Sequence, residues 1–424
     1  MSETIDAAIR EHIDAERIRE LFNLQGPVYE SRGGSFDGDI YGPLRRLREE
    51  RGPVVEGIFG PLVGYDGPGF FQGLPEPDRP HYCALDFETC DAVVRDAEHF
   101  GSSPGKGQLD AALSDNILYM DGERHHRYRA LVQPSFVPKK AQWWVQNWIQ
   151  ATVDALIDNI VEQGRADLNL DLFAPIPLLT ICGSMSVSVP DALDIRAAVT
   201  SDGLGIGKFF EIVAPLIEAR RTDPRDDLVT VMCDAELSND DGSVYALSND
   251  EILGFMFLLL AAGSGTTWKQ MGITAHALLT HPDWLARVRD DRTLLRAAVE
   301  EALRWQPTDP MFSRFVLADT TLGGVDLPEG AVIHMMFSAA NRDPARWDDP
   351  DTFDPGRPLK SHMGFGGGHH VCLGMHVARA EIATVMTGVL DRLPGVRLDP
   401  DAPEPKVTGV YERGPTAVPV VWDV

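Results

Sequence analysis

The sequence is short of cysteine, of positive charge and of long hydrophobic runs. Its 424 residues include five cysteines without paired spacing, which argues against a disulfide framework. The 38 basic residues face 64 acidic ones, and the net charge of −26 disfavours nucleic acids and anionic membranes as partners. The longest apolar run, residues 252–262, is interrupted by Gly254 and is too short to cross a bilayer.

Targeting signals and domain boundaries are lacking as well. The N-terminus carries acidic residues early and fits neither a secretory signal nor an Arg-rich transit peptide, so we expect a soluble cytoplasmic protein. No repeat, low-complexity segment or shift in composition marks a linker. We therefore expect residues 1–424 to form a single domain, with residues 1–39 as an N-terminal extension.

A glycine-rich segment around Cys372 is the most informative part of the chain. Residues 365–374 read FGGGHHVCLG, and a helix is expected directly behind them, from Met375 to Leu393. A thiol at a helix N-terminus is favoured as thiolate, because free backbone N–H groups and the helix dipole stabilise negative charge. The glycines let the backbone approach the sulfur and donate hydrogen bonds to it. The pattern predicts that Cys372 is a metal ligand.

Two other interpretations of this segment stay open. His369, His370, Cys372 and His376 could bind zinc, although structural zinc sites usually combine a Cys-x2–4-Cys pair with a second pair, and no second pair occurs. Cys372 could also be a structural cysteine without a ligand role.

A long buried helix is expected in the second half of the chain. Ser248 and Glu251 form a capping box, and the helix should run to about His281 before Pro282 ends it. It is far longer than the average of about 11–12 residues, and its centre is apolar nearly all round, which indicates burial. Residues 262–267 at this centre include Gly and Ser, which are poor helix formers. Such a local violation points to function.

These two segments resemble the cytochrome P450 family. Its haem-binding loop, F-G-x-G-x-H-x-C-L-G, and its oxygen-binding helix kink, A/G-G-x-[D/E]-T-T, both have counterparts here. The matching residues are Phe365, Gly366, Gly368, His370, Cys372, Leu373 and Gly374 in the loop, and Ala262, Gly263, Thr266 and Thr267 in the helix. Gly265 departs from the pattern, because the family usually has an acid at this position.

The resemblance implies a mainly α-helical fold with a small β-rich portion, haem b as cofactor, and Cys372 as ligand of its iron. Four side chains match residues that bind the two haem propionates: His125, Arg129, Arg314 and His370. Other residues expected beside the haem are Phe365, Gly366, Gly374, Ala262 and Gly263.

A structural ion triad is also implied. Glu301 and Arg304 match the family's E-x-x-R, and Arg357 matches the third member of its buried triad. Taken alone, the Glu301–Arg304 pair would be read as a solvated pair on a helix surface.

The activity implied is that of a haem-thiolate monooxygenase, which inserts one oxygen atom from O2 into a small to medium apolar organic molecule. A thiolate ligand favours cleavage of the O–O bond. The reacting region would contain Ser264, Gly265, Thr266 and Thr267. Because Gly265 lacks the acid, protons would have to arrive through Thr266, Ser264, waters or the substrate.

The walls of the substrate pocket are expected from the same resemblance, although plain core packing explains any single apolar residue among them equally well. They are Leu113, Ile117, Leu118, Leu258, Ala262, Thr267, Pro310, Met311, Tyr411 and Glu412. The segment that should roof the pocket, residues 190–220, looks short and is rich in glycine. A loose roof would admit a bulky or carrier-borne substrate.

No flavin- or ferredoxin-type segment is evident, so electrons should come from NAD(P)H through an external ferredoxin or flavodoxin and its reductase. A basic cluster, which is either a docking face for that partner or a solvated helix surface with cofactor ligands, comprises Arg124, Arg127, Arg129, Lys139 and Lys140. Two alternatives stay open. Gly265 favours peroxide-driven oxidation or oxidative coupling, and a haem protein without turnover is the other.

Overall fold

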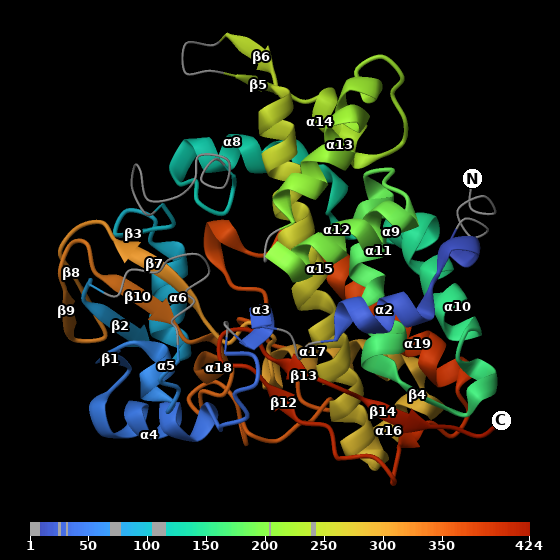
Figure 1. Cartoon of the computed structure of the whole chain (residues 1–424). Coiled ribbons are helices and arrows are strands. Elements are labelled where there is room, and N and C mark those ends of the chain that lie inside the picture. The colour runs from blue at the N-terminus through green and yellow to red at the C-terminus, as the bar shows by residue number, and fades with distance from the viewer. Residues whose placement is uncertain are drawn as a thin grey trace.

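A long central helix, α15 (Asn249–Thr280), organises the helical part of the molecule (Figure 1). It begins at the expected capping box, in which the Ser248 side chain accepts from the Glu251 backbone and the Glu251 side chain accepts from the Ser248 backbone. It ends just before Pro282, so the sequence predicted both ends correctly. The computed structural model describes residues 9–23, 27–30, 33–67, 78–103, 116–202, 205–238 and 243–424.

Helices that precede and follow α15 in the sequence pack against it. These contacts explain why α15 is apolar nearly all round. They are α11 (Pro175–Ser184), α13 (Ile206–Arg220), α14 (Leu228–Cys233), α16 (Pro282–Asp290), α17 (Leu295–Trp305) and α19 (Met375–Arg392). Their buried side chains join those of α15 in the largest apolar core. The helix α19 begins at Met375, directly behind Cys372, as the sequence predicted.

Further helices cover this core and the sheet. They are α2 (Ala15–Phe22), α3 (Pro27–Glu30), α4 (Tyr41–Arg51), α5 (Phe59–Leu62), α6 (Phe87–Arg95), α8 (Gly122–Val132), α9 (Pro138–Trp144), α10 (Gln150–Asp158), α12 (Val189–Asp202) and α18 (Phe337–Ala340). In α2, Ile18 and Phe22 are buried in the main core, and Arg17 pairs with Asp194 of α12. The described part of the N-terminal extension therefore packs onto the rest of the chain.

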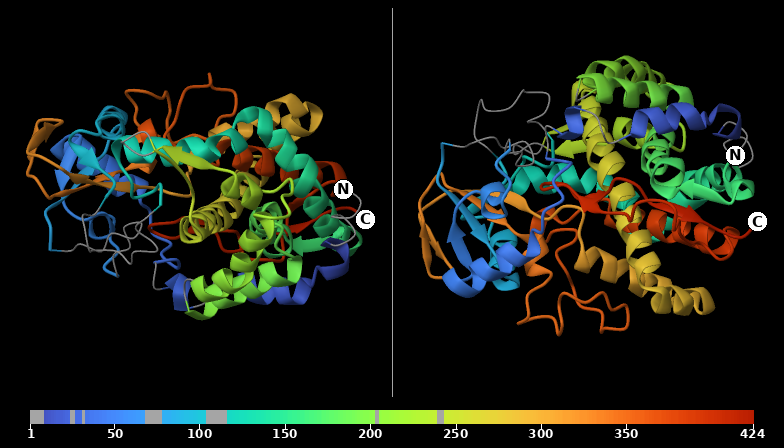
Figure 2. Two further views of the ribbon diagram at one scale, coloured as in Figure 1. Left: turned by 90° about the horizontal axis from the view of Figure 1, so that it is seen from above. Right: turned by 60° about the horizontal axis from the view of Figure 1, so that its bottom comes forward.

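The largest sheet lies beside the helical part (Figure 2). Its order is β1 (Val54–Glu56), β2 (His81–Ala84), β10 (Val332–Met335), β7 (Phe312–Val316) and β3 (Phe100–Gly101). β10 runs parallel to β2 and antiparallel to β7, and this register sets Arg314 opposite Ile333 in the buried middle of the sheet.

The other strands form small units. A three-stranded sheet has the order β11 (Arg397–Leu398), β14 (Pro419–Val421) and β4 (Arg165–Asp167). The two-stranded units are β5 (Glu236–Ser238) with β6 (Val244–Ala246), β8 (Thr320–Leu322) with β9 (Val325–Leu327), and β12 (Val407–Thr408) with β13 (Gly414–Pro415). The β12–β13 pair matters for the site, because β13 packs against α15 and brings the turn at 409–413 to it.

The apolar character of α15 also bears on membranes. Within the described ranges, α15 is long and apolar enough to cross a bilayer, and the bent pair 169–184 and 189–199 meets the same criterion when its halves are taken together. Half of the apolar stretch of α15 is buried inside the protein, and the helices named above pack against it. Its composition is that of a core helix.

Candidate active site

The loop that carries Cys372 depends on glycines at two positions. Gly366 has φ +68° and Gly368 has φ +62°, conformations that residues with a side chain rarely adopt. A Cβ atom on Gly368 would lie 1.7 Å from the Val94 carbonyl oxygen, so no other residue fits there without moving the backbone. The Cys372 N–H donates to the Phe365 carbonyl at 2.9 Å and closes the loop.

The Cys372 side chain is exposed, yet enough protein surrounds its sulfur that burial raises the pKa of the thiol. A hydrogen bond from the Gly374 backbone and the charges of Arg129 and Arg379 act in the opposite direction, but they are the smaller effects. The sequence predicted a thiolate, because only the helix N-terminus behind Cys372 was considered there. In this setting the thiolate needs a directly bound cation, which a metal ion supplies.

Two imidazole rings meet beside this loop. The rings of His125 in α8 and His370 in the loop lie 4.1 Å apart between centroids and are inclined by 34°. Burial, together with the charges of His370 and Arg129, lowers the pKa of His125 to about 3, so this ring is neutral at neutral pH. Its Nε2 atom is buried and has no hydrogen-bond partner in the described structure. His370 Nε2 lies 3.0 Å from Ser102 Oγ.

Two arginines complete the group, and their surroundings are unusual. Arg129 donates to the Val371 carbonyl at 2.7 Å, and Arg314 donates to the Ser313 carbonyl at 2.8 Å. Within the described part of the chain neither guanidinium has a carboxylate at ion-pair distance. Burial lowers the pKa of Arg314 to about 10, so this side chain remains charged at neutral pH.

A buried cation without a counter-charge is costly, and a desolvated carboxylate is its natural partner. Asp121 is the carboxylate whose charge reaches Arg314, but it is not at ion-pair distance from either arginine. Two arginines without an ion-pair partner and an unsatisfied histidine nitrogen, close to a thiol, fit a metal centre that carries two carboxylates. Haem b has this composition. The structure gives no support to the zinc alternative, since no group of three or more His, Cys, Asp and Glu side chains that could hold a metal ion is found in the described ranges.

The middle of α15 differs from the expectation in one respect. The predicted helix kink at 262–267 does not interrupt the helix, which is continuous from Asn249 to Thr280. The Thr266 hydroxyl donates to the Ala262 carbonyl at 3.0 Å, and this back-bonding engages the hydroxyl inside the helix. The expectation treated Gly and Ser as breakers, whereas packing on both sides overrides their weak propensity. Ala261 and Ala262 are exposed in an otherwise buried helix, and the residues up to Thr266 are half-buried.

A charged cluster borders this stretch. Glu412, from the turn between β12 and β13, accepts from Lys269 Nζ at 2.6 Å. A Cβ atom on Gly265 would lie 3.3 Å from the same Glu412 oxygen. Asp309, in the loop after α17, is buried enough that its pKa rises to about 7, with the charge of Glu412 raising it further and that of Lys269 lowering it. Glu412 was expected in the pocket wall, but its pairing with Lys269 and the role of Asp309 were not predicted.

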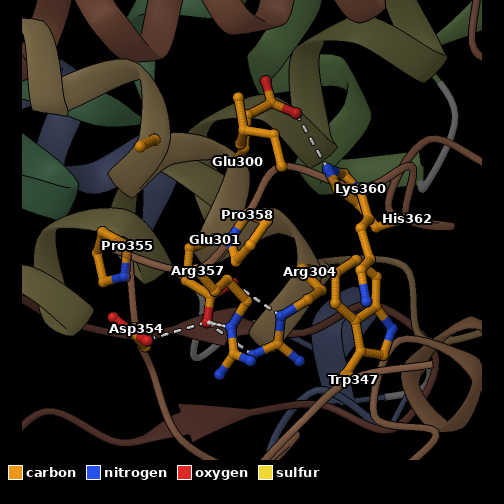
Figure 3. A pocket seen from close by; sticks show the side chains of 12 residues that line it. Glu300, Glu301, Arg304, Trp347, Asp354, Pro355, Arg357, Pro358, Lys360 and His362 are labelled. Carbon is orange, nitrogen blue, oxygen red and sulfur yellow. Dashed lines mark hydrogen bonds and ion pairs between the residues drawn. The ribbon is translucent and has the colours of Figure 1, made fainter. Parts of the chain in front are cut away.

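The structural triad involves the C-terminal half of α17. Glu301 Oε1 lies 2.7 Å from Arg304 Nη2 and 3.0 Å from Arg357 Nε (Figure 3). Glu301 is 4% exposed and also accepts from the Asp354 backbone at 2.9 Å. The remaining donors of Arg304 go to the carbonyls of Asn341, Pro350 and Thr352. The pair is therefore a buried, fully satisfied network and not a solvated helix pair. The surface pocket in Figure 3 is lined by these structural residues.

A second carboxylate next to the triad braces the Cys372 loop, and sequence reasoning missed it. Glu300 accepts from Arg379 Nε at 2.5 Å and lies 3.1 Å from His362 Nε2. Arg379 stands 4.5 Å over the Phe365 ring, one turn into the helix behind Cys372. Burial raises the pKa of Glu300, but the hydrogen bonds outweigh it and lower the pKa to about 2. In the sequence, the only signal for this contact was the short spacing between Cys372 and Arg379, which places Arg379 near the start of the expected helix.

The residues expected in the substrate pocket fall into two groups. Ile117, Met311 and Tyr411 are fully buried in the apolar clusters, and Pro310 and Thr267 are buried as well. Leu118, Leu258 and Glu412 are half-buried, and Ala262 is exposed. Leu113 lies outside the described residues. The segment expected to roof the pocket forms two helices, α12 and α13, and α13 packs against α15.

The expected basic cluster separates into two parts. Arg129 turns inward to the Cys372 loop. The other four lie on α8 and α9 and are called here the basic surface: Arg124, Arg127, Lys139 and Lys140, of which Arg127 is half-buried and the others are exposed.

Comparisons with known proteins agree with this geometry. The sequence model described as "Cytochrome P450" matches residues 206–409. The chain is 31% identical to the cytochrome P450 monooxygenase PikC of Streptomyces venezuelae, over 92% of both chains. It is 33% identical to the steroid C26-monooxygenase of Mycolicibacterium smegmatis, over 78% of this chain and 86% of the relative.

Solved structures give the same result. The myxobacterial cytochrome P450 CYP267B1, crystallised with myristic acid, superimposes with a TM-score of 0.78 at 29% identity, over 93% of this chain and 98% of that one. The chain belongs to the cytochrome P450 family. Its relatives include monooxygenases, hydroxylases and epoxidases of bacteria, and the protein is a haem-thiolate monooxygenase of this bacterial type.

Proposed function

We propose that Cys372 Sγ ligates the iron of haem b and that the haem lies between the Cys372 loop and the middle of α15. The observation that carries this proposal is the buried Arg314 and the half-buried Arg129, neither of which has a carboxylate at ion-pair distance among the described residues, together with the unsatisfied His125 nitrogen. His125, Arg129, Arg314 and His370 would bind the propionates by charge-assisted hydrogen bonds. The iron supplies the oxygen chemistry when it is bound.

The remaining haem contacts follow from the same placement. Phe365, Gly366 and Gly374 would line the thiolate face, where the left-handed backbone of Gly366 brings the loop close. Ala262 and Gly263 would line the opposite face, because their small side chains leave room beside α15. Ser264, Thr266 and Thr267 are the hydroxyl groups at this face, and Gly265 contributes no side chain.

The proposed substrate is an apolar organic molecule of small to medium size. A bulky or carrier-borne molecule is the other substrate type that we propose for this site. The exposed Ala262 and half-buried Leu258 on α15 support an apolar surface beside the reacting face. A relative named for a steroid and a neighbour crystallised with myristic acid, a fatty acid, support this choice. Leu113, Ile117, Leu118, Pro310, Met311 and Tyr411 would complete the walls.

Electrons would come from NAD(P)H through a reductase and a ferredoxin or flavodoxin that docks on the basic surface. These carriers are acidic proteins, and opposite charge accelerates encounter on a chain whose overall charge is −26. The whole set of partners belongs in the cytoplasm, where we place the protein. The overall reaction consumes substrate RH, O2, two protons and two electrons and yields ROH and water.

The test of this function is isotope incorporation. Holoenzyme supplied with an iron–sulfur reductase system, NAD(P)H and a library of steroids, fatty acids and macrolides is incubated under ¹⁸O2. We expect one ¹⁸O atom in the hydroxylated or epoxidised product and none from labelled water. Turnover with added peroxide alone, at a rate above that with the reductase system, would contradict the proposal and favour peroxide-driven oxidation.

A further inference from the structure

Three separate segments bring ionisable side chains to one face of α15. Lys269 comes from the helix itself, Asp309 from the loop after α17, and Glu412 from the β12–β13 turn. Lys269 and Glu412 are joined by a 2.6 Å ion pair, and the side chains are 7% and 30% exposed. Lys269 is held further by the rings of Tyr29 and Trp268, each with its centroid 5.5 Å away. The cluster is therefore fixed on the helix and open to water at Glu412.

Gly265 is what allows Glu412 to take this position. Residues 265 and 269 are one turn apart and share a helix face, so a carboxylate bonded to Lys269 lies over residue 265. A Cβ on Gly265 would lie 3.3 Å from Glu412 Oε1, so a side chain at this position would be in tight contact with the Glu412 carboxylate. The Glu412 carboxylate therefore lies directly beside the position where a side chain on residue 265 would begin.

On the basis of the proposed function, we propose that Glu412 is the proton-relaying carboxylate for the Thr266 region of α15, and that Lys269 positions it. It takes the part that a helix acid at position 265 would play. The reaction needs two protons per turnover at this face, and a carboxylate that is partly exposed and adjoins the helix can pass them from solvent to the hydroxyl of Thr266 or to water. Each transfer moves one proton and leaves the carboxylate to be reprotonated by water.

The groups that face Glu412 agree with exchangeable protons. Asp309 stands close enough for the Glu412 charge to raise its pKa, which reaches about 7, so this carboxyl gains and loses a proton near neutral pH. Tyr29 adjoins from α3, and burial, with a smaller contribution from Glu412, raises the pKa of this phenol. The neighbouring Arg413 is turned away, since its guanidinium donates to the carbonyls of Gly409 and Val407. Among the described residues, Lys269 is the cation that forms an ion pair with Glu412.

A purely structural role, in which the ion pair ties the C-terminal turn to α15, makes different predictions. The decisive set is Glu412→Gln, Gly265→Asp and the double variant, measured as holoenzyme. If Glu412 relays protons, Glu412→Gln should form product about tenfold more slowly and release more peroxide per NAD(P)H consumed. The double variant, which restores an acid on the helix after the competing carboxylate is gone, should recover most of this loss. A structural role predicts that the double variant is no better than Glu412→Gln.

Two controls keep the result interpretable. The carbonyl complex of each variant must retain the red-shifted Soret band, because loss of that band would point to failure of the haem-thiolate assignment and not of the relay. Infrared difference spectra across neutral pH provide a readout that does not depend on turnover. The carboxyl band that disappears in Asp309→Asn should move to lower pH in Glu412→Gln. An unmoved band, or wild-type coupling in Glu412→Gln with an intact Soret band, would overturn the proposal.

Discussion

Acidic side chains have different surroundings in two regions of the proposed haem site, called here the thiolate side and the oxygen side. On the thiolate side, two acids of α17 each have at least two hydrogen-bond partners. Glu301 binds Arg304 and Arg357, and Glu300 binds Arg379 and His362. On the oxygen side, the side proposed to hold oxygen, with the middle of α15, the loop at Asp309 and the turn at Glu412, two carboxyl groups share the cation of Lys269. Besides burial, the charge of Asp309 also reaches the Cys372 thiol and raises its pKa.

The difference appears in two half-buried carboxyl groups. Hydrogen bonds outweigh burial at Glu300 and lower its pKa to about 2, whereas burial and a neighbouring negative charge raise the pKa of Asp309 to about 7. Glu300 is ionised at any physiological pH and serves as scaffold. Asp309 exchanges a proton near neutrality, which is what a side that must deliver protons requires.

The largest effect should come from breaking the triad. Glu301→Gln leaves Arg304 and Arg357 buried without a charge partner, and removal of one member of such a network costs about 3–5 kcal/mol of unfolding free energy. Urea denaturation followed by tryptophan fluorescence measures it. The matched control is Asp423→Asn, whose pair with Arg397 is 70% and 57% exposed and contributes about 0–1 kcal/mol. Equal losses in the two variants would contradict the comparison.

The two perturbed carboxyl groups should give stability profiles of opposite sign. The native pKa of Glu300 is below its ordinary 4.5, so its contribution of about 2–3 kcal/mol is present above pH 4.5 and lost as the pH falls towards 2. The native pKa of Asp309 is above its ordinary 3.8, so its contribution is full below that pH and lost as the pH rises through 7. Glu300→Gln should therefore destabilise at pH 7, and Asp309→Asn should stabilise at pH 8. Profiles of the same sign would remove the distinction between the sides.

The arginines between the two sides should affect cofactor retention. Arg314→Ala removes a charged hydrogen bond to a desolvated carboxylate and should weaken haem binding by about 1.5–3 kcal/mol. Transfer of haem to an acceptor apoprotein measures the change, with Arg397→Ala as the control on an exposed arginine. A transfer rate for Arg314→Ala equal to that of the control would refute the propionate assignment.

The smallest effect should come from the basic surface. Reversal of Lys139 and Lys140 to Glu should slow reduction by the partner protein, and raising the salt concentration should slow the wild type in the same way, because the Debye length is about 8 Å at physiological ionic strength. Stopped-flow reduction at two salt concentrations measures both. Reversal of Arg397, far along the chain on β11, provides the control. Salt-independent reduction would indicate an uncharged docking surface.

The two sides also differ in how well the sequence predicted them. The Cys372 loop, the cap of α15 and the Glu301–Arg304 pair are encoded within short segments, where spacing along a helix or a turn fixes the contact. The Lys269–Glu412 pair joins residues that are 143 positions apart, and no local pattern reports it. The break expected within residues 262–267 is absent, because propensity argued for it while tertiary packing keeps α15 continuous.

The central claim is that the two sides face each other across a haem whose iron is ligated by Cys372. The most direct test is the absorption spectrum of the dithionite-reduced carbonyl complex of the wild type and of Cys372→Ser. We predict the strongly red-shifted Soret band of thiolate ligation in the wild type and its complete loss in Cys372→Ser, while Arg397→Ala keeps it. A Cys372→Ser protein that retains the red-shifted band would contradict the account.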